Sequence, residues 1–390
     1  MSIKKWCFSI AMFCCLAGVS AQETSNLRNF PAQISIWHPV GTHGQQSRQH
    51  TYNLSLNLLY GRVGGVNGLE ISGLASVVEG RVRGIQLAGL VNVVGDNVRG
   101  IQMSGFTNIT GDTARGLQAT VFANIVGDEM RGIQMSGFTN VVGDNLRGIQ
   151  AAGFANVVGD EMIGLQMGGF ANVVGDNARG IQVAGGANRV GNEMIGLQIG
   201  IHNRTNTLRG LQIGLISIND TIASGASLSL VNIVRQGFYR EWQLSFSDYA
   251  NIALSYKMGT QRFYTLYTIG ANFIEDNLWL AGIGFGNRTP ISNRIDFQPE
   301  LVFYNYFPIN FRNIQHTFTT RLRFGFVYSI NEKLGLSLAP SVYVKNARRN
   351  SNNPDAAFYN ISPFSPFYTN ERGSRLRAIG AGVSLGLSFR

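Results

Sequence analysis

Six aspartates recur at intervals of sixteen residues, and five of them are followed three places later by an arginine. The aspartates are Asp96, Asp112, Asp128, Asp144, Asp160 and Asp176, and the arginines are Arg99, Arg115, Arg131, Arg147 and Arg179. Stacked carboxylates are ligands for Ca²⁺ in some secreted repeat proteins. Each aspartate also follows a glycine, a pair that suits a tight turn, and the arginine would balance the charge of the aspartate. We favour the turn, and therefore expect no metal site.

Two columns of amide side chains share this spacing. Stacked amides bond to the equivalent amide above and below them. We predict surface ladders of Gln86, Gln102, Gln118, Gln134, Gln150 and Gln166, and of Asn92, Asn108, Asn124, Asn140, Asn156 and Asn172, continued by Gln182, Gln198 and Asn188. Such ladders would present a regular Gln, Asn and Arg surface to a partner.

The other reactive residue types give no catalytic pattern. The five histidines form no pair at metal-ligand spacing on one predicted strand, and His38 and His43 in WHPVGTHG would need carboxylates from elsewhere to hold a metal. No P-loop and no strand-then-helix dinucleotide fingerprint occurs. The sequence therefore predicts neither an enzyme nor a cofactor.

The element that must position these columns is a repeat. Nine units, G-[IL]-Q-x-x-G-F-x-N-V-V-G-D-x-x-R, start at Gly68, Gly84, Gly100, Gly116, Gly132, Gly148, Gly164, Gly180 and Gly196, and the last is shortened to fourteen residues. Three glycines in each unit disfavour helix. We interpret each repeat as one coil of a flattened parallel β-solenoid. The alternative is an antiparallel meander, which a weak recurrence of Glu-Met every thirty-two residues favours.

The N-terminus has the composition of an export signal. Residues 1–21 carry Lys4 and Lys5, an apolar stretch and a Val-Ser-Ala ending, and they contain all three cysteines. No later run of eighteen apolar residues predicts a membrane helix. The formal charge of +10 comes mostly from arginines without the aromatic interleaving of a nucleic-acid site. We expect an anionic membrane surface as partner, and no nucleic acid.

The C-terminal part, from about residue 218, alternates apolar and polar residues. Examples are Ile295–Asn305 and Phe318–Tyr328. Segments of about ten residues with one apolar, aromatic-rich face are typical of outer-membrane barrels, although a soluble β-sandwich alternates in the same way.

We therefore predict an all-β chain in which the repeats are inserted in, or joined to, an antiparallel barrel of 8–10 strands. The predicted divisions are a signal peptide (1–21), a loop segment (22–48), the first barrel strand (49–60), the repeat region (61–217) and the barrel (218–390). Asn346–Arg375 is predicted to be its longest loop.

Charged residues on the polar face of the predicted barrel strands are expected to form a buried ion network and not a selectivity filter, because side chains fill the interior of so small a barrel. They are Asp296, Glu300, Arg321, Arg323, Lys333 and Lys345. The sequence thus favours a non-enzymatic outer-membrane surface protein with a structural or binding role. The alternative is a porin-like channel in which the repeats contribute membrane strands. Expected partners are outer-membrane lipid and another envelope protein or a surface glycan.

The repeat motif resembles that of a known family. GLQIGIHN at Gly196–Asn203, the GIQ-x-x-GFxN units before it and GVNGLEISG at Gly65–Gly73 are similar to the surface repeat-containing proteins of Bacteroidetes and spirochaetes. In Bacteroidetes members a strand like NLSLNLLYG precedes the repeats and a barrel-like region follows them. The resemblance implies a cell-envelope location, and it supplies no activity and no site residues.

Overall fold

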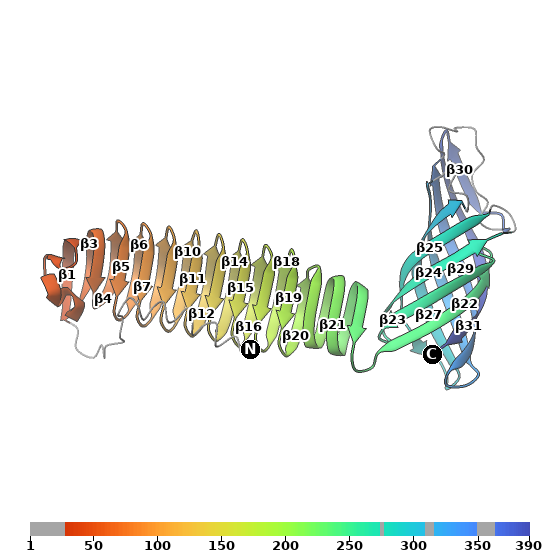
Figure 1. Ribbon diagram of the computed structural model, residues 1–390, viewed down its shortest axis with the longest axis horizontal. Coiled ribbons are helices and arrows are strands. Elements are labelled where there is room, and N and C mark those ends of the chain that lie inside the picture. The colour runs from red at the N-terminus through yellow and green to blue at the C-terminus, as the bar shows by residue number, and fades with distance from the viewer. Residues whose placement is uncertain (1–27, 274–276, 309–315, 349–362) are drawn as a thin grey trace. The chain divides into compact units, whose positions relative to one another are not determined.

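The computed structural model describes residues 28–273, 277–308, 316–348 and 363–390. They form a parallel β-solenoid of about 10 turns, followed in sequence by a closed antiparallel barrel of 8 strands (Figure 1). Two compact units result, one reaching Leu215 and including 223–225, the other comprising 216–222 and 226–390. Among the described residues no helix is long and apolar enough to cross a membrane. The predicted signal peptide lies outside the described residues.

Each repeat contributes one long and one short strand to the solenoid. The long strands are β4 (Gly65–Ser72), β6 (Val82–Ala88), β8 (Val98–Ser104), β10 (Ala114–Thr120), β12 (Glu129–Ser136), β14 (Asn145–Ala152), β16 (Met162–Gly168), β18 (Ala178–Ala184) and β20 (Glu193–Ile199). The short strands are β5 (Ala75–Val78), β7 (Val91–Val94), β9 (Thr107–Thr110), β11 (Ala123–Val126), β13 (Thr139–Val142), β15 (Ala155–Val158), β17 (Ala171–Val174) and β19 (Ala187–Val190).

We call the two stacks the long-strand sheet and the short-strand sheet. Successive strands in each sheet pair in parallel with a register of one repeat, as Gly116 with Gly132 and Asn124 with Asn140. The solenoid prediction is therefore confirmed, and the antiparallel-meander alternative is wrong.

The first glycine of each repeat is required by the stacking. From Gly84 to Gly210 this residue has a positive φ of 127° to 149°, a conformation that other residues rarely adopt. A Cβ built on Gly148 would lie 2.0 Å from the carbonyl oxygen of Gly132 in the preceding coil. The repeated glycine thus allows both the bend and the close approach of successive coils.

The inside of the solenoid contains two apolar rows and the two amide columns. One row comes from the long-strand sheet and includes Met130, Leu146 and Met162, and the other comes from the short-strand sheet and includes Val142 and Val158, all of them fully or almost fully buried. The amides between these rows are buried as well. The core is therefore half apolar and half hydrogen-bonded.

The first coil corrects two predictions. It consists of β1 (Arg28–Trp37), β2 (Val40–Gly41), the 3₁₀ helix η1 (Gly44–Gln49) and β3 (His50–Val63). The predicted loop segment contains β1, which pairs in parallel with β3. The predicted first barrel strand is β3, which pairs in parallel with β1, β4 and β5 and so belongs to the solenoid. Period-two alternation identifies a strand but not its neighbours, which is why this assignment failed.

The barrel is formed by β22 (Tyr239–Ser247), β23 (Ile252–Gly259), β24 (Tyr264–Asn272), β25 (Leu278–Gly286), β27 (Ile295–Pro308), β28 (His316–Ser329), β29 (Leu334–Arg348) and β31 (Arg375–Phe389). Pairing of β22 with β31 closes it, with Trp242 opposite Phe389. Two further strands, β26 (Thr289–Pro290) and β30 (Tyr368–Arg372), pair with β27 and β31. The predicted long loop falls partly outside the described residues.

The junction between repeats and barrel also differs from the prediction. β21 (His202–Val234) continues the parallel stacking beyond residue 217, since the Arg235 amide bonds the Asn219 carbonyl oxygen at 3.0 Å. The barrel strands begin only at Tyr239. The repeats are thus joined to a barrel that closes by itself, and are not inserted into it.

Candidate functional site

The amide ladders exist, but they lie inside the solenoid. Gln134 donates to Gln118 at 3.0 Å, and Gln150 donates to Gln134 at 2.8 Å. Asn140 donates to Asn156 at 3.0 Å and to the Ala151 carbonyl oxygen at 2.7 Å. The two columns, from Gln86 to Gln166 and from Asn92 to Asn172, are at most 1% exposed. The predicted surface ladder is therefore wrong, and the amides form a hydrogen-bonded core.

The side chains next to each ladder glutamine point outward instead. Ile133 and Met135, which flank Gln134, are 40% and 43% exposed. Phe138 in the same coil is 43% exposed. Sequence reasoning placed glutamine outside because it is polar, and so missed an apolar outer surface. The signal was present, because neighbours on a strand face opposite sides.

Glu70 occupies the glutamine position at the start of one ladder. It lies opposite Gln86, which donates to its carboxylate at 3.0 Å, and it is fully buried. Burial raises the pKa of the Glu70 carboxyl, although the hydrogen bonds from Ser76, Gln86, Ser55 and Asn57 oppose this. The ionised form is therefore disfavoured by folding.

We expect Glu70→Gln to stabilise the solenoid at pH 7 and to have little effect near pH 4. A carboxyl whose folded pKa is raised contributes full stability below its unfolded pKa of about 4.3, and loses that contribution as pH rises through the folded pKa. Thermal unfolding between pH 4 and pH 8 measures the difference. The exposed Glu161→Gln is the matched control, and an equal pH response of the two variants would contradict the expectation.

The aspartate column lies on the turns that enter the long strands. Burial raises the pKa of Asp96 and of Asp128, and the Asp112 carboxylate between them raises both further. Two neighbouring arginines pair with the same glutamate. Arg131 lies 2.7 Å and Arg147 lies 3.8 Å from the Glu129 carboxylate. Among the described residues, no group of three or more His, Cys, Asp or Glu side chains is arranged to hold a metal ion.

Two histidines that sequence reasoning kept apart meet in the first coil. The His43 and His50 rings lie 5.6 Å apart and pack with Phe30 and Tyr52. His38 lies instead beside Ser47, at 3.1 Å. His43 and His50 are separated by η1, so their proximity is a product of the helical turn and has no spacing signal in the sequence.

The barrel lumen contains a network of buried charges. Lys257 is 3.0 Å from Glu241 and 2.8 Å from Glu300, and it donates to Gln298 at 2.6 Å. Glu300 also lies 3.0 Å from Arg323, and accepts a hydrogen bond from Tyr264 at 2.8 Å. All these charged side chains are at most 2% exposed. Each charge is thus neutralised by a partner from another strand.

A second charge pair fills the lumen nearer the turn after β22. Arg321 makes a two-pronged contact with the Asp248 carboxylate, with distances of 3.0 Å and 2.9 Å, and both side chains are fully buried. The guanidinium lies between the rings of Tyr249 and Tyr343, 4.3 Å and 4.7 Å from their centroids. This arrangement compensates for the removal of both charges from water.

The predicted network residues are mostly in this lumen. Glu300, Arg321 and Arg323 lie in it as described, and Asp296 pairs with Arg288 and Arg390 at 2.7 Å and 2.9 Å. Lys345 is buried, whereas Lys333 is exposed on the turn before β29. Sequence reasoning missed Glu241, Asp248 and Lys257. Lys257 and Glu241 occupy the polar side of β23 and β22, and this alternation was the available signal.

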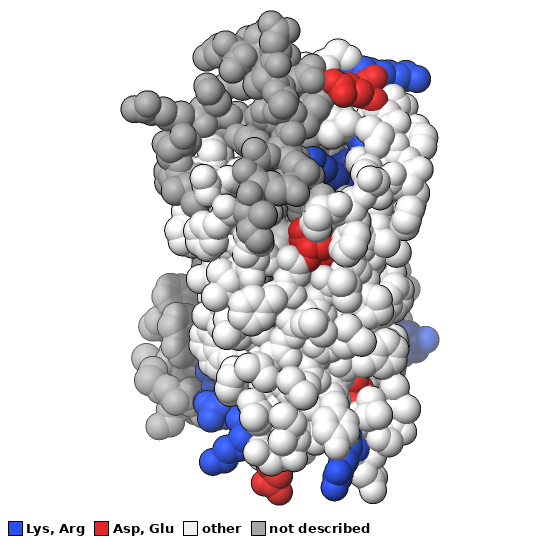
Figure 2. Space-filling view, turned by 90° about the vertical axis from the view of Figure 1, so that its right-hand side faces the viewer, with Lys and Arg blue, Asp and Glu red and all other residues white. Residues whose placement is uncertain are grey.

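The barrel buries many polar side chains and exposes many large apolar ones. Buried lumen positions include Gln243, Ser245, Thr268, Thr319 and Ser341, beside a buried cluster of tyrosines and aliphatic residues that includes Leu266, Leu280 and Val302. The exposed apolar side chains include Trp242, Trp279, Leu301, Leu322, Leu338 and Leu385, which are 39% to 59% exposed. Figure 2 shows one side of the barrel, where uncharged side chains cover most of the surface and charged ones lie mainly toward the two ends, with an acidic group also near mid-height.

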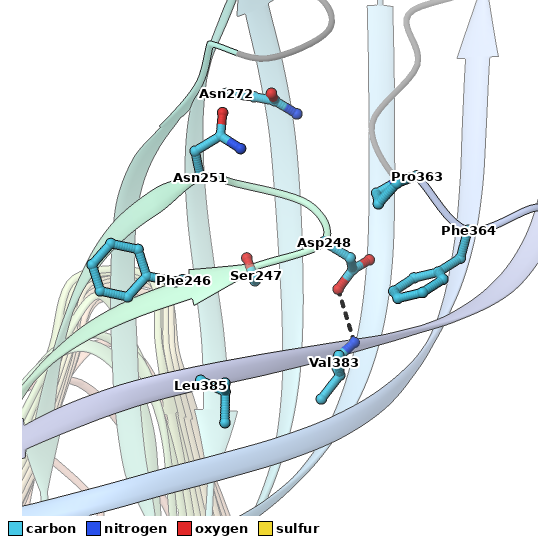
Figure 3. A pocket seen from close by; sticks show the side chains of 9 residues that line it. All are labelled: Phe246, Ser247, Asp248, Asn251, Asn272, Pro363, Phe364, Val383 and Leu385. Atoms are coloured by element: carbon cyan, nitrogen blue, oxygen red, sulfur yellow. Dashed lines mark hydrogen bonds between the residues drawn. The ribbon is translucent and has the colours of Figure 1, made fainter.

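A pocket of about 380 Å³ lies where β22 leaves the wall of the barrel (Figure 3). It is lined by Phe246, Ser247, Asp248, Asn251, Asn272, Pro363, Phe364, Val383 and Leu385. Its carboxylate, from Asp248, accepts a hydrogen bond from the Val383 amide at 3.0 Å and pairs with Arg321. The described lining therefore offers amides and apolar side chains, and its one carboxylate, Asp248, is already paired with the buried Arg321.

No protein-family model, curated protein or solved structure matches this chain.

Proposed function

We propose that this chain is an exported, non-enzymatic outer-membrane protein whose barrel is a membrane anchor and whose solenoid has a structural or binding role. The observation that carries the proposal is the polarity of the barrel, which encloses charged and hydrogen-bonded side chains and exposes large apolar ones. An outer wall of this kind matches a bilayer, where the strands satisfy every backbone hydrogen bond by closing.

Two features of the sequence support the location. Residues 1–21 have the pattern of an export signal, and the repeats resemble those of envelope surface proteins. The strands β27, β28, β29 and β31 have 14 to 15 residues, enough to cross a bilayer when tilted.

The contents of the lumen favour an anchor over a channel. Arg321, Arg323, Lys257, Tyr264, Tyr304 and Tyr306 are among the largest fully buried side chains. Barrels of about eight strands have interiors that side chains fill. The channel alternative also required the repeats to be membrane strands, and they form parallel coils instead.

Cell fractionation tests the proposal. We expect the protein in the outer-membrane fraction, resistant to a carbonate wash, and shifted in gel mobility by boiling as folded barrels are. Release of a folded protein into the soluble periplasmic fraction would overturn the anchor.

A further inference from the structure

The outer surface of the long-strand sheet is a continuous apolar face. The second, fourth and seventh positions of every sixteen-residue repeat point outward, as Ile133, Met135 and Phe138 do in one coil. From Leu69 to Gly186 none of these positions carries a charge. We call this surface the apolar face.

The apolar face is as large as the largest apolar patch of a typical monomer. Coils stack about 4.8 Å apart, so the eight coils from Leu69 to Gly186 give a strip roughly 38 Å long and about 15 Å wide, on the order of 570 Å². The largest apolar patch on a typical monomer is about 300–600 Å², and it often has a function. The area of the apolar face therefore suits a contact surface for a partner.

The phenylalanines at its edge restrict what the partner is. Phe106, Phe122, Phe138, Phe154 and Phe170 stack with centroid separations of 4.8 to 5.2 Å and interplanar angles of at most 8°. Within the column each ring covers the faces of its neighbours, and among the described residues no ring covers the outer faces of Phe106 and Phe170 at its two ends. A sugar ring stacks on an open aromatic face, which the column offers only at its ends, whereas hydrocarbon packs against ring edges along the whole column.

A row of arginines borders the opposite edge of the apolar face. It consists of Arg83, Arg99, Arg115, Arg131, Arg147 and Arg179, which emerge two residues before the isoleucine or leucine of each repeat. Like charges on neighbouring strands repel. Arg131 and Arg147 share Glu129, but Arg83, Arg99, Arg115 and Arg179 make no ion pair with any residue in the described part of the chain. The row therefore favours a partner that presents anionic groups along the whole length of the row.

We propose that the apolar face lies against a lipid leaflet, with the arginine row at the level of anionic headgroups. A guanidinium group donates two parallel hydrogen bonds to the oxygens of one phosphate. The side chains of the apolar face exchange contact with water for contact with lipid acyl chains. The inference rests on the proposed function, because the barrel holds the chain at the membrane and so raises the effective lipid concentration.

Site-specific fluorescence quenching tests this proposal on the full chain. Residues 22–390 contain no cysteine, so single cysteines can be labelled. Val183→Cys puts a label on the apolar face, and Arg189→Cys puts one on the exposed side of the short-strand sheet in the same coil. The labelled chains are reconstituted in vesicles containing about one-third phosphatidylglycerol, with quenchers attached to the lipid acyl chains.

We expect the label at position 183 to be quenched at least threefold more than the label at 189. Arg99→Gln with Arg115→Gln should reduce quenching at 183 in the anionic vesicles, and Arg189→Gln should not. Equal quenching at the two positions, or a disulfide-linked dimer of Val183→Cys in place of quenching, would overturn the proposal.

Carbonate-resistant flotation of the same vesicles reports separately on the barrel. If flotation fails, the anchor is wrong, and labelled protein added to preformed anionic vesicles then decides whether the apolar face binds lipid. If flotation succeeds without quenching at position 183, the anchor stands and the apolar face has another partner.

Discussion

Arg321→Met should destabilise the barrel by about 3–5 kcal/mol, because it leaves the buried Asp248 carboxylate without its guanidinium. Asp248 lies inside the lumen with no exposed surface on its side chain, and Arg321 is its two-pronged partner. The variant also removes the cation that lies between Tyr249 and Tyr343. Urea unfolding of the protein in detergent, followed by the fluorescence of Trp242 and Trp279 in a Trp37→Phe background, measures the loss.

Two controls separate the buried pair from a general effect of losing an arginine. Arg240→Met removes a charge from the outward side of β22 and should change stability by no more than about 0.5 kcal/mol. Asp248→Asn combined with Arg321→Met removes both charges and should cost less than Arg321→Met alone. A double variant that is less stable than Arg321→Met alone would show that the Asp248 carboxylate does not depend on Arg321 to compensate for its burial.

Asn140→Ala should destabilise the solenoid by about 3–5 kcal/mol, since one buried amide serves several partners and each buried polar group left unsatisfied costs about 1–3 kcal/mol. Asn140 accepts from Asn124 at 2.9 Å and donates to Asn156 at 3.0 Å and to the Ala151 carbonyl oxygen at 2.7 Å. Coils interact mainly with their neighbours, so the loss concentrates at this point of the column. Limited proteolysis should then cut near residue 140 before it cuts elsewhere in the repeats.

The matched control is Asn145→Ala in the same coil. The Asn145 side chain is half-buried at the first position of β14 and takes no part in the ladder, so its removal should leave the cleavage rate close to that of the natural protein. Equal sensitivity of the two variants would show that the buried ladder contributes no more than a surface amide.

The period of the repeat was enough to predict the solenoid, because a sixteen-residue unit with three glycines suits a coil better than a helix. It was not enough to decide which side chains face inward. Gln134 and Ile133 are adjacent, and polarity alone assigns the glutamine to water. The ladder reverses that assignment, because stacked amides satisfy one another inside the column, as the 2.6 to 3.0 Å contacts show.

Alternation was sufficient for the barrel strands but not for the arrangement of their neighbours. β3 alternates like a barrel strand, yet its backbone pairs with β1, β4 and β5. Glu241 was missed although it lies on the polar, inward side of β22, next to the outward Trp242. Asp248 was missed because it follows the end of β22, and its position in the lumen depends on the closure of β22 with β31. Such contacts join residues far apart in the sequence and leave no local pattern.

The most direct test of the central claim, that the barrel is an anchor filled by its own side chains, is the conductance of the purified protein in a planar lipid bilayer. Insertion is confirmed first by heat-modifiable gel mobility of the same preparation. With Lys257, Arg321 and Arg323 paired across the lumen, we expect no stable conductance above that of the bare membrane. A steady, ohmic pore from inserted protein would contradict this account and establish a channel.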